Sequence, residues 1–421
     1  MSSFLKSCAV FTGLLLMAPT YAEVCLVPLK IVNIGSASTP VFKIGINVGL
    51  GGGIPKLYEF DTGGPGFWAA YNKNLKPASQ WWGDTNLIAS SAMSIKYTSG
   101  NEYTANLVGT QIELFDPSEQ KASSPLCKSS TVQISQITSF NNSKSANSVV
   151  KQWNTRLAHG KAPLYKHFWG DFGAALHPAM SSTVEQGVYN VLNQFQTGAE
   201  HNGFIVHIGD LSKSQYKQQK PYVQIGINAT DINSFPYQFQ MNTLCPSTGP
   251  GSPNCPLWST FSNTAVNTFA EAQFNADVTL NGIAGSPPAE LLPGMGIIID
   301  SGATLANIYQ NPDCVTNCYV SKSFIADPRP EPGISPTLYK GLFVNGYSAT
   351  ISGTPQKEGT FSTTLTQSSK PLNSSINANY SANKAGSGKG GVMNTGVLFY
   401  SNWDVMYDVT AGVIGFRPAM Q

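Results

Sequence analysis

The amino-acid sequence predicts an all-β, or mainly β, protein, and three observations lead to that fold class. Short runs in which apolar and polar residues alternate recur along the chain, separated by turns rich in glycine and proline. A single stretch has the apolar spacing of a helix. Two apolar runs, in 58–68 (YEFDTGGPGFW) and 296–309 (GIIIDSGATLANIY), each end in an aspartate followed by a hydroxyl residue and glycine.

The predicted strands pair in hairpins. Residues 93–114 alternate on both sides of Gly100, which suits the turn of a β-hairpin. Residues 204–209 and 222–228 predict another pair of strands. Further strands are predicted at 274–282 and 404–416.

One helix is predicted, over 184–195. Its apolar residues fall at i, i+4, i+7, i+8 and i+11, and they are Val184, Val188, Val191, Leu192 and Phe195. Two stretches rich in small polar residues, 240–262 and 351–391, predict surface insertions without regular structure.

The N-terminus predicts a signal peptide over residues 1–22. Lys6 provides the positive charge, and residues 8–18 form an apolar stretch too short to span a bilayer. Thr20 and Ala22 fit a cleavage site after Ala22, and an uncleaved anchor is the alternative. Since no later stretch reaches about 18 consecutive apolar residues, we expect an exported protein, periplasmic or extracellular, without stable membrane association.

The cysteines predict disulfides. Cys8 lies in the predicted signal peptide, and six remain: Cys25, Cys127, Cys245, Cys255, Cys314 and Cys318. An even number in an exported chain favours disulfides. The local pairs 245–255 and 314–318 close the shortest loops, which would leave Cys25 for Cys127. A metal site competes with this interpretation, but no histidine has ligand spacing beside the cysteines.

Composition gives little reason to expect a charged partner or a cofactor. Charged residues make up 11% of the 421-residue chain and the net charge is +2, so neither nucleic acid nor an acidic membrane is an expected partner. The chain has no HExxH, P-loop or G-x-S-x-G motif. Gly386, Gly388 and Gly391 satisfy G-x-G-x-x-G without a preceding strand and are interpreted as linker glycines. We expect a monomer with no cofactor and no metal.

Each aspartate motif places a carboxylate at the end of a buried strand. Alone, such a tripeptide is more often an ordinary turn, but the apolar runs that end at Asp61 and Asp300 predict strands inside the protein. A buried, unpaired carboxylate is costly. Two that face each other can share one proton, which places an acid beside a base. The duplication therefore predicts one site built from two halves of the chain.

In these features the chain resembles the pepsin-like aspartic peptidases, in which two related β lobes each contribute one Asp-Thr/Ser-Gly loop. The resemblance implies a bilobal pepsin-like acid-protease fold with a central cleft and a flap hairpin. It implies an N-terminal β lobe over 23–208, with Asp61 and the flap, and a C-terminal β lobe over 209–421, with Asp300.

Further positions match the family's pattern. Trp68 follows Asp61 by seven residues, and Tyr97, in SIKYTSG, falls at the flap tyrosine, a pair that hydrogen-bonds in the family. The segments 170–178 and 394–418 resemble those that cross beneath the two aspartate loops. The implied crossing glycines are Gly173 and Gly396. The implied supports of the aspartate dyad are Thr62, Gly63, Ser301 and Gly302.

The chain also departs from that pattern. Gly64 and Ala303 stand where the family usually has Ser or Thr after each tripeptide, and Asn394 and Thr395 replace an apolar pair. Loss of both hydroxyl donors predicts raised pKa values for the aspartate pair and a weakly acidic activity optimum.

Three functions fit these features. The first is an exported aspartic endopeptidase that hydrolyses a polypeptide substrate with Asp61, Asp300 and an activated water; retention of both aspartates favours it. The alternative is a catalytically inactive pepsin-fold binding protein, which the missing hydroxyls favour. A secreted β-rich surface protein with chance motifs is the third.

Overall fold

A computed structural model describes most of the chain. It describes residues 24–74, 81–118, 124–145, 147–181, 187–195, 197–211, 216–244, 269–311, 319–334, 337–357, 359–368, 374–380 and 391–419. The predicted signal peptide and four predicted disulfide cysteines lie outside these residues; the cysteines are Cys245, Cys255, Cys314 and Cys318.

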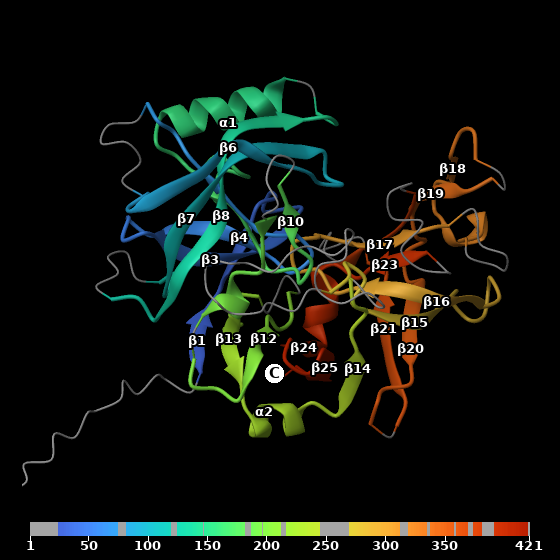
Figure 1. The fold of residues 1–421 in the computed structure, drawn as a ribbon. Helices are drawn as coiled ribbons and strands as arrows, with labels where there is room; N and C mark the ends of the chain where they lie inside the picture. Colours follow the sequence, from blue (N-terminus) through green and yellow to red (C-terminus); the bar gives the residue numbers. More distant parts are fainter. Residues whose placement is uncertain are drawn as a thin grey trace, which may run out of the picture.

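Three large sheets make up the described fold, which confirms the prediction of a mainly β protein. An N-terminal and a C-terminal sheet lie side by side, and a third, shared sheet lies beneath them (Figure 1). In spatial order the N-terminal sheet consists of β2 (Lys30–Asn33), β3 (Phe42–Leu50), β4 (Lys56–Asp61), β9 (Gly170–Gly173), β5 (Phe67–Ala70), β8 (Cys127–Asn142), β7 (Asn101–Phe115) and β6 (Thr85–Lys96).

The C-terminal and shared sheets follow the same all-β construction. The C-terminal sheet consists, in order, of β18 (Arg329–Pro330), β19 (Tyr339–Leu342), β22 (Ile376–Asn379), β17 (Ala306–Tyr309), β23 (Val392–Asn394), β16 (Glu290–Ile298), β15 (Phe274–Asn281), β20 (Ser348–Gly353) and β21 (Phe361–Thr366). The shared sheet consists of β1 (Cys25–Pro28), β13 (Tyr222–Ile227), β12 (His201–His207), β24 (Trp403–Asp408), β25 (Val413–Pro418) and β14 (Tyr237–Gln240). A small ribbon pairs β10 (Ala179–Met180) with β11 (Gly187–Val188).

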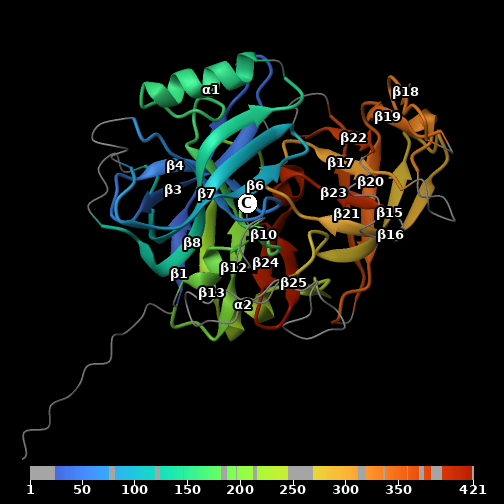
Figure 2. The same ribbon diagram turned by 45° about the horizontal axis from the view of Figure 1, so that its top comes forward.

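Helices are short and peripheral. Helix α1 (Ser148–Ala158) lies on the outer side of the N-terminal sheet, where it buries Trp153 and Leu157 (Figures 1 and 2). Helix α2 (Ala229–Ser234) lies below the shared sheet (Figure 1). Single 3₁₀ turns are η1 (Leu192–Gln194), η2 (Lys322–Phe324) and η4 (Val397–Ser401). No helix in the described part of the chain has the length and apolar character needed to cross a membrane.

The shared sheet joins the two halves of the chain. Strands β12 and β13, on either side of the expected boundary at 208/209, pair antiparallel, and β12 also pairs with β24 near the C-terminus. A disulfide between Cys25 and Cys127, as predicted, links β1 of the shared sheet to β8 of the N-terminal sheet. The halves are thereby held in one arrangement, with β4 and β16 in neighbouring sheets.

Most predicted strands are confirmed. The hairpin expected over 93–114 is β6–β7, and Gly100 at its turn has a φ of +92°, which suits glycine. The pair expected at 204–209 and 222–228 is β12–β13. The strand expected at 274–282 is β15, and the stretch 404–416 forms the β24–β25 hairpin.

The predicted helix over 184–195 is wrong in its described part. Residues 187–188 form β11, and only η1 is helical. All of residues 187–195 are buried, so burial does not mark out one helical face in the described part of this stretch. Asn190 also competes with helix formation, since its side chain accepts from Leu192 N at 2.8 Å and donates to Ala174 O at 2.5 Å.

The expectation that 351–391 lacks regular structure is also wrong in part. Residues 361–366 form β21, which pairs in register with β20, and 376–379 form β22. The sequence FSTTLT buries alternate residues and exposes those between them, so its strand pattern outweighs its polar composition. The described residues of the other expected insertion, 240–262, include the end of β14.

Candidate active site

Two pairs of parallel strands deliver the aspartates. β4 ends at Asp61 and pairs in parallel with β9, which places Asp61 opposite Gly173. β16 ends two residues before Asp300 and pairs in parallel with β23. A Cβ on Gly173 would lie 2.2 Å from a backbone oxygen, and one on Gly396, whose φ is +61°, would lie 2.7 Å from another. The segments that cross beneath the aspartate loops therefore have no room for a side chain there.

Reciprocal hydrogen bonds between Thr62 and Ser301, the Thr62–Ser301 clasp, hold the two aspartate loops together. Thr62 N donates to Ser301 Oγ at 3.0 Å, and Ser301 N donates to Thr62 Oγ1 at 2.9 Å. Each hydroxyl then donates across to the opposite strand, Thr62 Oγ1 to Ile299 O at 2.9 Å and Ser301 Oγ to Phe60 O at 2.8 Å. Each buried hydroxyl is both donor and acceptor, so the two loops hold each other in a fixed position.

The clasp brings the two carboxylates together. A Cβ on Gly63 would lie 2.3 Å from Asp300 Cγ, and a Cβ on Gly302 would lie 2.1 Å from Asp61 Cγ. Each carboxylate thus lies against the glycine of the opposite loop, and any larger residue would displace it. Asp61 and Asp300 are both only 8% exposed.

Backbone amides hold one oxygen of each carboxylate. Asp61 Oδ1 accepts from Gly63 N at 2.8 Å and Gly64 N at 2.9 Å. Asp300 Oδ1 accepts the equivalent pair of bonds at 2.7 and 2.9 Å. Burial nevertheless raises the pKa of Asp61 well above its ordinary value, and the charge of Asp300 raises it further. Asp61 therefore retains a proton to higher pH than an exposed aspartate.

The expectation that Asp300 lacks a side-chain donor is wrong. Asn394 Nδ2 donates to Asp300 Oδ2 at 2.5 Å, and Asn394 Oδ1 is held by Gly396 N at 2.9 Å. The amide comes from β23 and not from the aspartate loop. It was missed because Asn394 was interpreted only as the loss of an apolar residue, although its position two residues before a crossing glycine was the available signal.

Tyr97 and Trp68 do not make the hydrogen bond that the resemblance suggested. Tyr97 lies at the turn of the β6–β7 hairpin, where its N–H donates to Asn101 O at 2.8 Å. Trp68 on β5 is fully buried, and its Nε1 donates to Pro65 O at 2.8 Å. Burial raises the pKa of the Tyr97 hydroxyl, and the neighbouring carboxylate of Asp171 raises it further.

Three buried charged residues beside the dyad were missed from the sequence. Lys43 on β3 forms an ion pair with Glu59 on β4, and Lys43 Nζ also donates to Gly302 O of the opposite loop. Asp171 on β9 lies opposite Glu59 in the strand register. Their signal was a charged residue inside an apolar strand run, in a chain with 11% charged residues.

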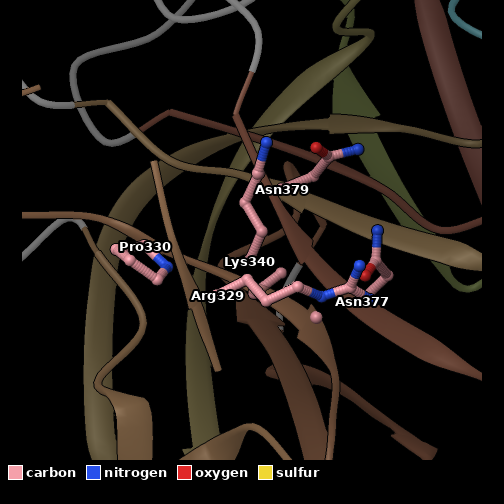
Figure 3. A pocket seen from close by; sticks show the side chains of 7 residues that line it. Arg329, Pro330, Lys340, Asn377 and Asn379 are labelled. Carbon is pink, nitrogen blue, oxygen red and sulfur yellow. The ribbon is translucent and has the colours of Figure 1, made fainter. Parts of the chain in front are cut away.

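One hollow among the described residues lies apart from this site. An open hollow of about 410 Å³ lies over β18, β19 and β22, and it contains none of the dyad residues. The residues that line it are Arg329, Pro330, Lys340, Gly341, Asn377, Ala378 and Asn379 (Figure 3). Within the described ranges, no group of three or more His, Cys, Asp or Glu side chains is placed to hold a metal ion.

Comparison with known structures identifies the fold. The chain matches the crystal structure of an aspartic proteinase from Irpex lacteus with a TM-score of 0.50 and 14% sequence identity, over 94% of this chain and 97% of that one. No protein-family model and no curated protein matches the sequence. The likeness shows the fold alone, and the predicted all-β, bilobal pepsin-like fold is confirmed.

Proposed function

We propose that this chain is an aspartic endopeptidase that hydrolyses peptide bonds with Asp61, Asp300 and a water activated between them. The observation that carries the proposal is the reciprocal clasp of Thr62 and Ser301, which sets each carboxylate against the glycine of the opposite loop. Two buried carboxylates that are brought together in this way cannot both ionise freely, so they share a proton and act as one acid and one base.

The proposed reaction proceeds through a tetrahedral intermediate. The ionised carboxylate takes a proton from the water as its oxygen attacks the peptide carbonyl carbon. The protonated carboxyl gives its proton to the carbonyl oxygen, which forms a diol. The diol collapses when the carboxyl that took the water proton gives it to the nitrogen, the other carboxylate takes a proton from one diol hydroxyl, and the C–N bond breaks, which leaves a carboxylic acid, an amine and a dyad with one proton. Thr62 and Ser301 keep the dyad in place, and the hairpin that carries Tyr97 closes over the substrate.

The same proposal includes the chain's location and organisation. Residues 1–22 direct export, to the periplasm or outside the cell, and the mature chain acts as a monomer on a polypeptide substrate. The N-terminal lobe ends at 208 and the C-terminal lobe begins at 209. The disulfide between Cys25 and Cys127 is compatible with an oxidising compartment.

Incubation with an unfolded protein tests the proposed activity. The purified chain is mixed with the substrate from strongly acidic to neutral pH, and mass spectrometry detects new internal termini. We expect internal cleavage. Retention of intact polypeptide on the immobilised chain, without new termini at any pH, would favour the inactive binding protein, an alternative supported by the absence of a hydroxyl at Gly64.

We expect the activity to peak in weak acid. Burial raises the pKa of Asp61, and the charge of Asp300 raises it further, so one proton stays on the pair at higher pH. As pH rises through this raised pKa the shared proton is lost and the rate falls; in strong acid both carboxyls are protonated and no base remains. The pH profile of kcat/KM checks this, and an optimum in strong acid would contradict it.

Replacement of Tyr97 with alanine is expected to lower kcat/KM by about 10- to 100-fold without abolishing cleavage, because the ring positions substrate and transfers no proton. Steady-state kinetics on a long peptide measure the effect. Tyr97→Phe is the matched control, since it keeps the ring and removes only the hydroxyl. Unchanged kcat and KM in Tyr97→Ala would remove this residue from the site.

A further inference from the structure

The strand register relates Asp171 and Asn394 as equivalent positions in the two lobes. On β9, Asp171 stands two residues before the crossing glycine Gly173. On β23, Asn394 stands two residues before the crossing glycine Gly396. β9 pairs in parallel with β4, which leads to Asp61, and β23 pairs in parallel with β16, which leads to Asp300. Side chains at the two positions therefore approach their aspartates from the same direction.

In the C-terminal lobe this position supplies a hydrogen-bond donor. Asn394 Nδ2 donates to Asp300 Oδ2 at 2.5 Å, on the oxygen that the loop amides leave free. Ala303 has no hydroxyl, so a crossing-strand side chain provides what its own loop lacks. The amide orientation is fixed because Gly396 N donates to Asn394 Oδ1 at 2.9 Å.

In the N-terminal lobe Asp171 reaches the corresponding space. Gly64 has no side chain, and a Cβ there would lie 2.6 Å from Asp61 Oδ2 and 3.3 Å from Asp171 Oδ2. The Asp171 carboxyl thus lies beside the space that a residue-64 hydroxyl would fill, on the side of the Asp61 oxygen that the loop amides leave free. Asp171 is 4% exposed, so water does not compete freely for it.

The surroundings favour a neutral Asp171. Burial raises its pKa well above the ordinary aspartate value, and the charge of Glu59 raises it further, while Tyr97 and Lys43 act in the opposite direction. An ionised carboxylate has only acceptors to offer Asp61, whereas a protonated one has an O–H donor. The titratable groups that face Asp171 are Lys43, Glu59, Asp61, Tyr97, Tyr103, Tyr165 and Asp300.

We propose that Asp171 is a positioning residue: a neutral carboxylic acid whose O–H donates to Asp61 Oδ2, as Asn394 donates to Asp300 Oδ2. The crossing strands β9 and β23, and not the aspartate loops, then supply both side-chain donors of the dyad. The catalytic part of this inference rests on the proposed peptidase function; the protonation of Asp171 does not.

Carbon-13 NMR tests the protonation directly, whether or not the chain cleaves peptides. The full protein is labelled at aspartate Cγ and titrated from acid to neutral pH. The Asp171 resonance is the one absent from Asp171→Asn. We expect it to keep the chemical shift of a protonated carboxyl while exposed aspartates ionise. A resonance that titrates together with the exposed aspartates would overturn the proposal.

Two substitutions test the donor. Asp171→Asn keeps a donor without a charge, so we expect wild-type kcat/KM and an unmoved pH profile. Asp171→Leu removes the donor, so we expect kcat/KM to fall about tenfold or more. Without the donor the pKa of Asp61 rises, so the acid limb of the kcat/KM pH profile should move up by about one pH unit.

Two kinetic outcomes would contradict this role. A profile of Asp171→Asn displaced to lower pH would mean that an ionised Asp171 is present in the native protein. An Asp171→Leu variant with both limbs unmoved would show that no donor was lost. If Asp171→Leu does not fold, as judged by its unfolding transition, the pH profile of Asp171→Asn and the NMR titration test the role of Asp171. If the native protein cleaves no peptide, the proposed function is contradicted. The NMR titration still tests the protonation of Asp171, because it does not depend on cleavage.

Discussion

Asp61→Asn and Asp300→Asn are each expected to reduce cleavage of an unfolded protein by about 10⁴-fold or more. The proposed dyad needs one carboxylate to accept a proton from water and the other to give one. An asparagine amide does neither at any working pH. Because the two residues act as a unit, the double variant is expected to lose little more than either single variant.

The fold is expected to survive both substitutions, because asparagine has the shape of aspartate and the Thr62–Ser301 clasp remains. Stability provides a second readout for Asp61. A carboxyl whose pKa is raised in the folded state binds its proton more tightly there, so the ionised form destabilises the fold above that pKa. Asp61→Asn should therefore gain stability at neutral pH, and the gain should vanish below the ordinary aspartate pKa.

Asp327→Asn is the matched control, since the side chain of Asp327 is 86% exposed. It should cleave at the wild-type rate and unfold at the wild-type denaturant concentration. Wild-type turnover by either dyad variant would end the proposal of a shared proton. Equal losses in the control would point to damage in preparation and not to the dyad.

The duplicated motif could be predicted from sequence because its signal is local. An apolar run that ends in Asp-Thr-Gly or Asp-Ser-Gly defines a buried strand and its turn within a dozen residues, and the same holds for the alternating strands of β6, β7 and β15. The conformation of 187–195 could not be predicted in the same way. Apolar spacing does not separate a helix from a segment buried on all sides, and the Asn190 bonds depend on tertiary neighbours.

The charged cluster escaped prediction for a different reason. Lys43, Glu59 and Asp171 each interrupt an apolar strand, and each interruption by itself is compatible with an exposed edge or a turn. Only the register of β4 against β9 shows that Glu59 and Asp171 are neighbours. The contact of Lys43 with Gly302 joins a strand of the N-terminal sheet to the Asp300 loop of the other half of the chain. The sequence shows which residues are charged, but their pairing depends on the packing of the strands.

The buried Lys43 leads to the second large expected effect. Lys43 and Glu59 are 6% and 5% exposed and form an ion pair, and Lys43 Nζ also donates to the carbonyl of Gly302. Burial by itself would lower the pKa of Lys43. The charge and hydrogen bond of Glu59, together with the charges of Tyr165 and Asp61, outweigh burial, and the net shift of the pKa is upward. The cation therefore stays charged at every pH where the protein would work.

Lys43→Met is expected to destabilise the fold by about 3–5 kcal/mol at neutral pH, because it leaves Glu59 buried without a partner. Burial already raises the pKa of Glu59, with Lys43 opposing that shift. Without Lys43, Glu59 should take up a proton more readily, so the folded state becomes relatively more stable as pH falls. The deficit should shrink in acid, and Lys43→Met/Glu59→Gln should recover much of it at neutral pH, since no unpaired charge remains.

Denaturant unfolding at neutral and acidic pH measures these differences, with Lys340→Met as the control. Lys340 also pairs with a glutamate, Glu331, but its side chain is 39% exposed, so water can solvate the partner that is left behind. The Lys340 variant should lose far less stability than Lys43→Met, and its loss should depend little on pH. Equal, pH-independent losses in the two lysine variants would mean that Glu59 is not held as a buried charge. If Lys43 neutralises Glu59 beneath the dyad and ties β3 to the Asp300 loop, Lys43→Met must lose much of its folding stability at neutral pH. That loss must also shrink in acid and be largely recovered in the double variant.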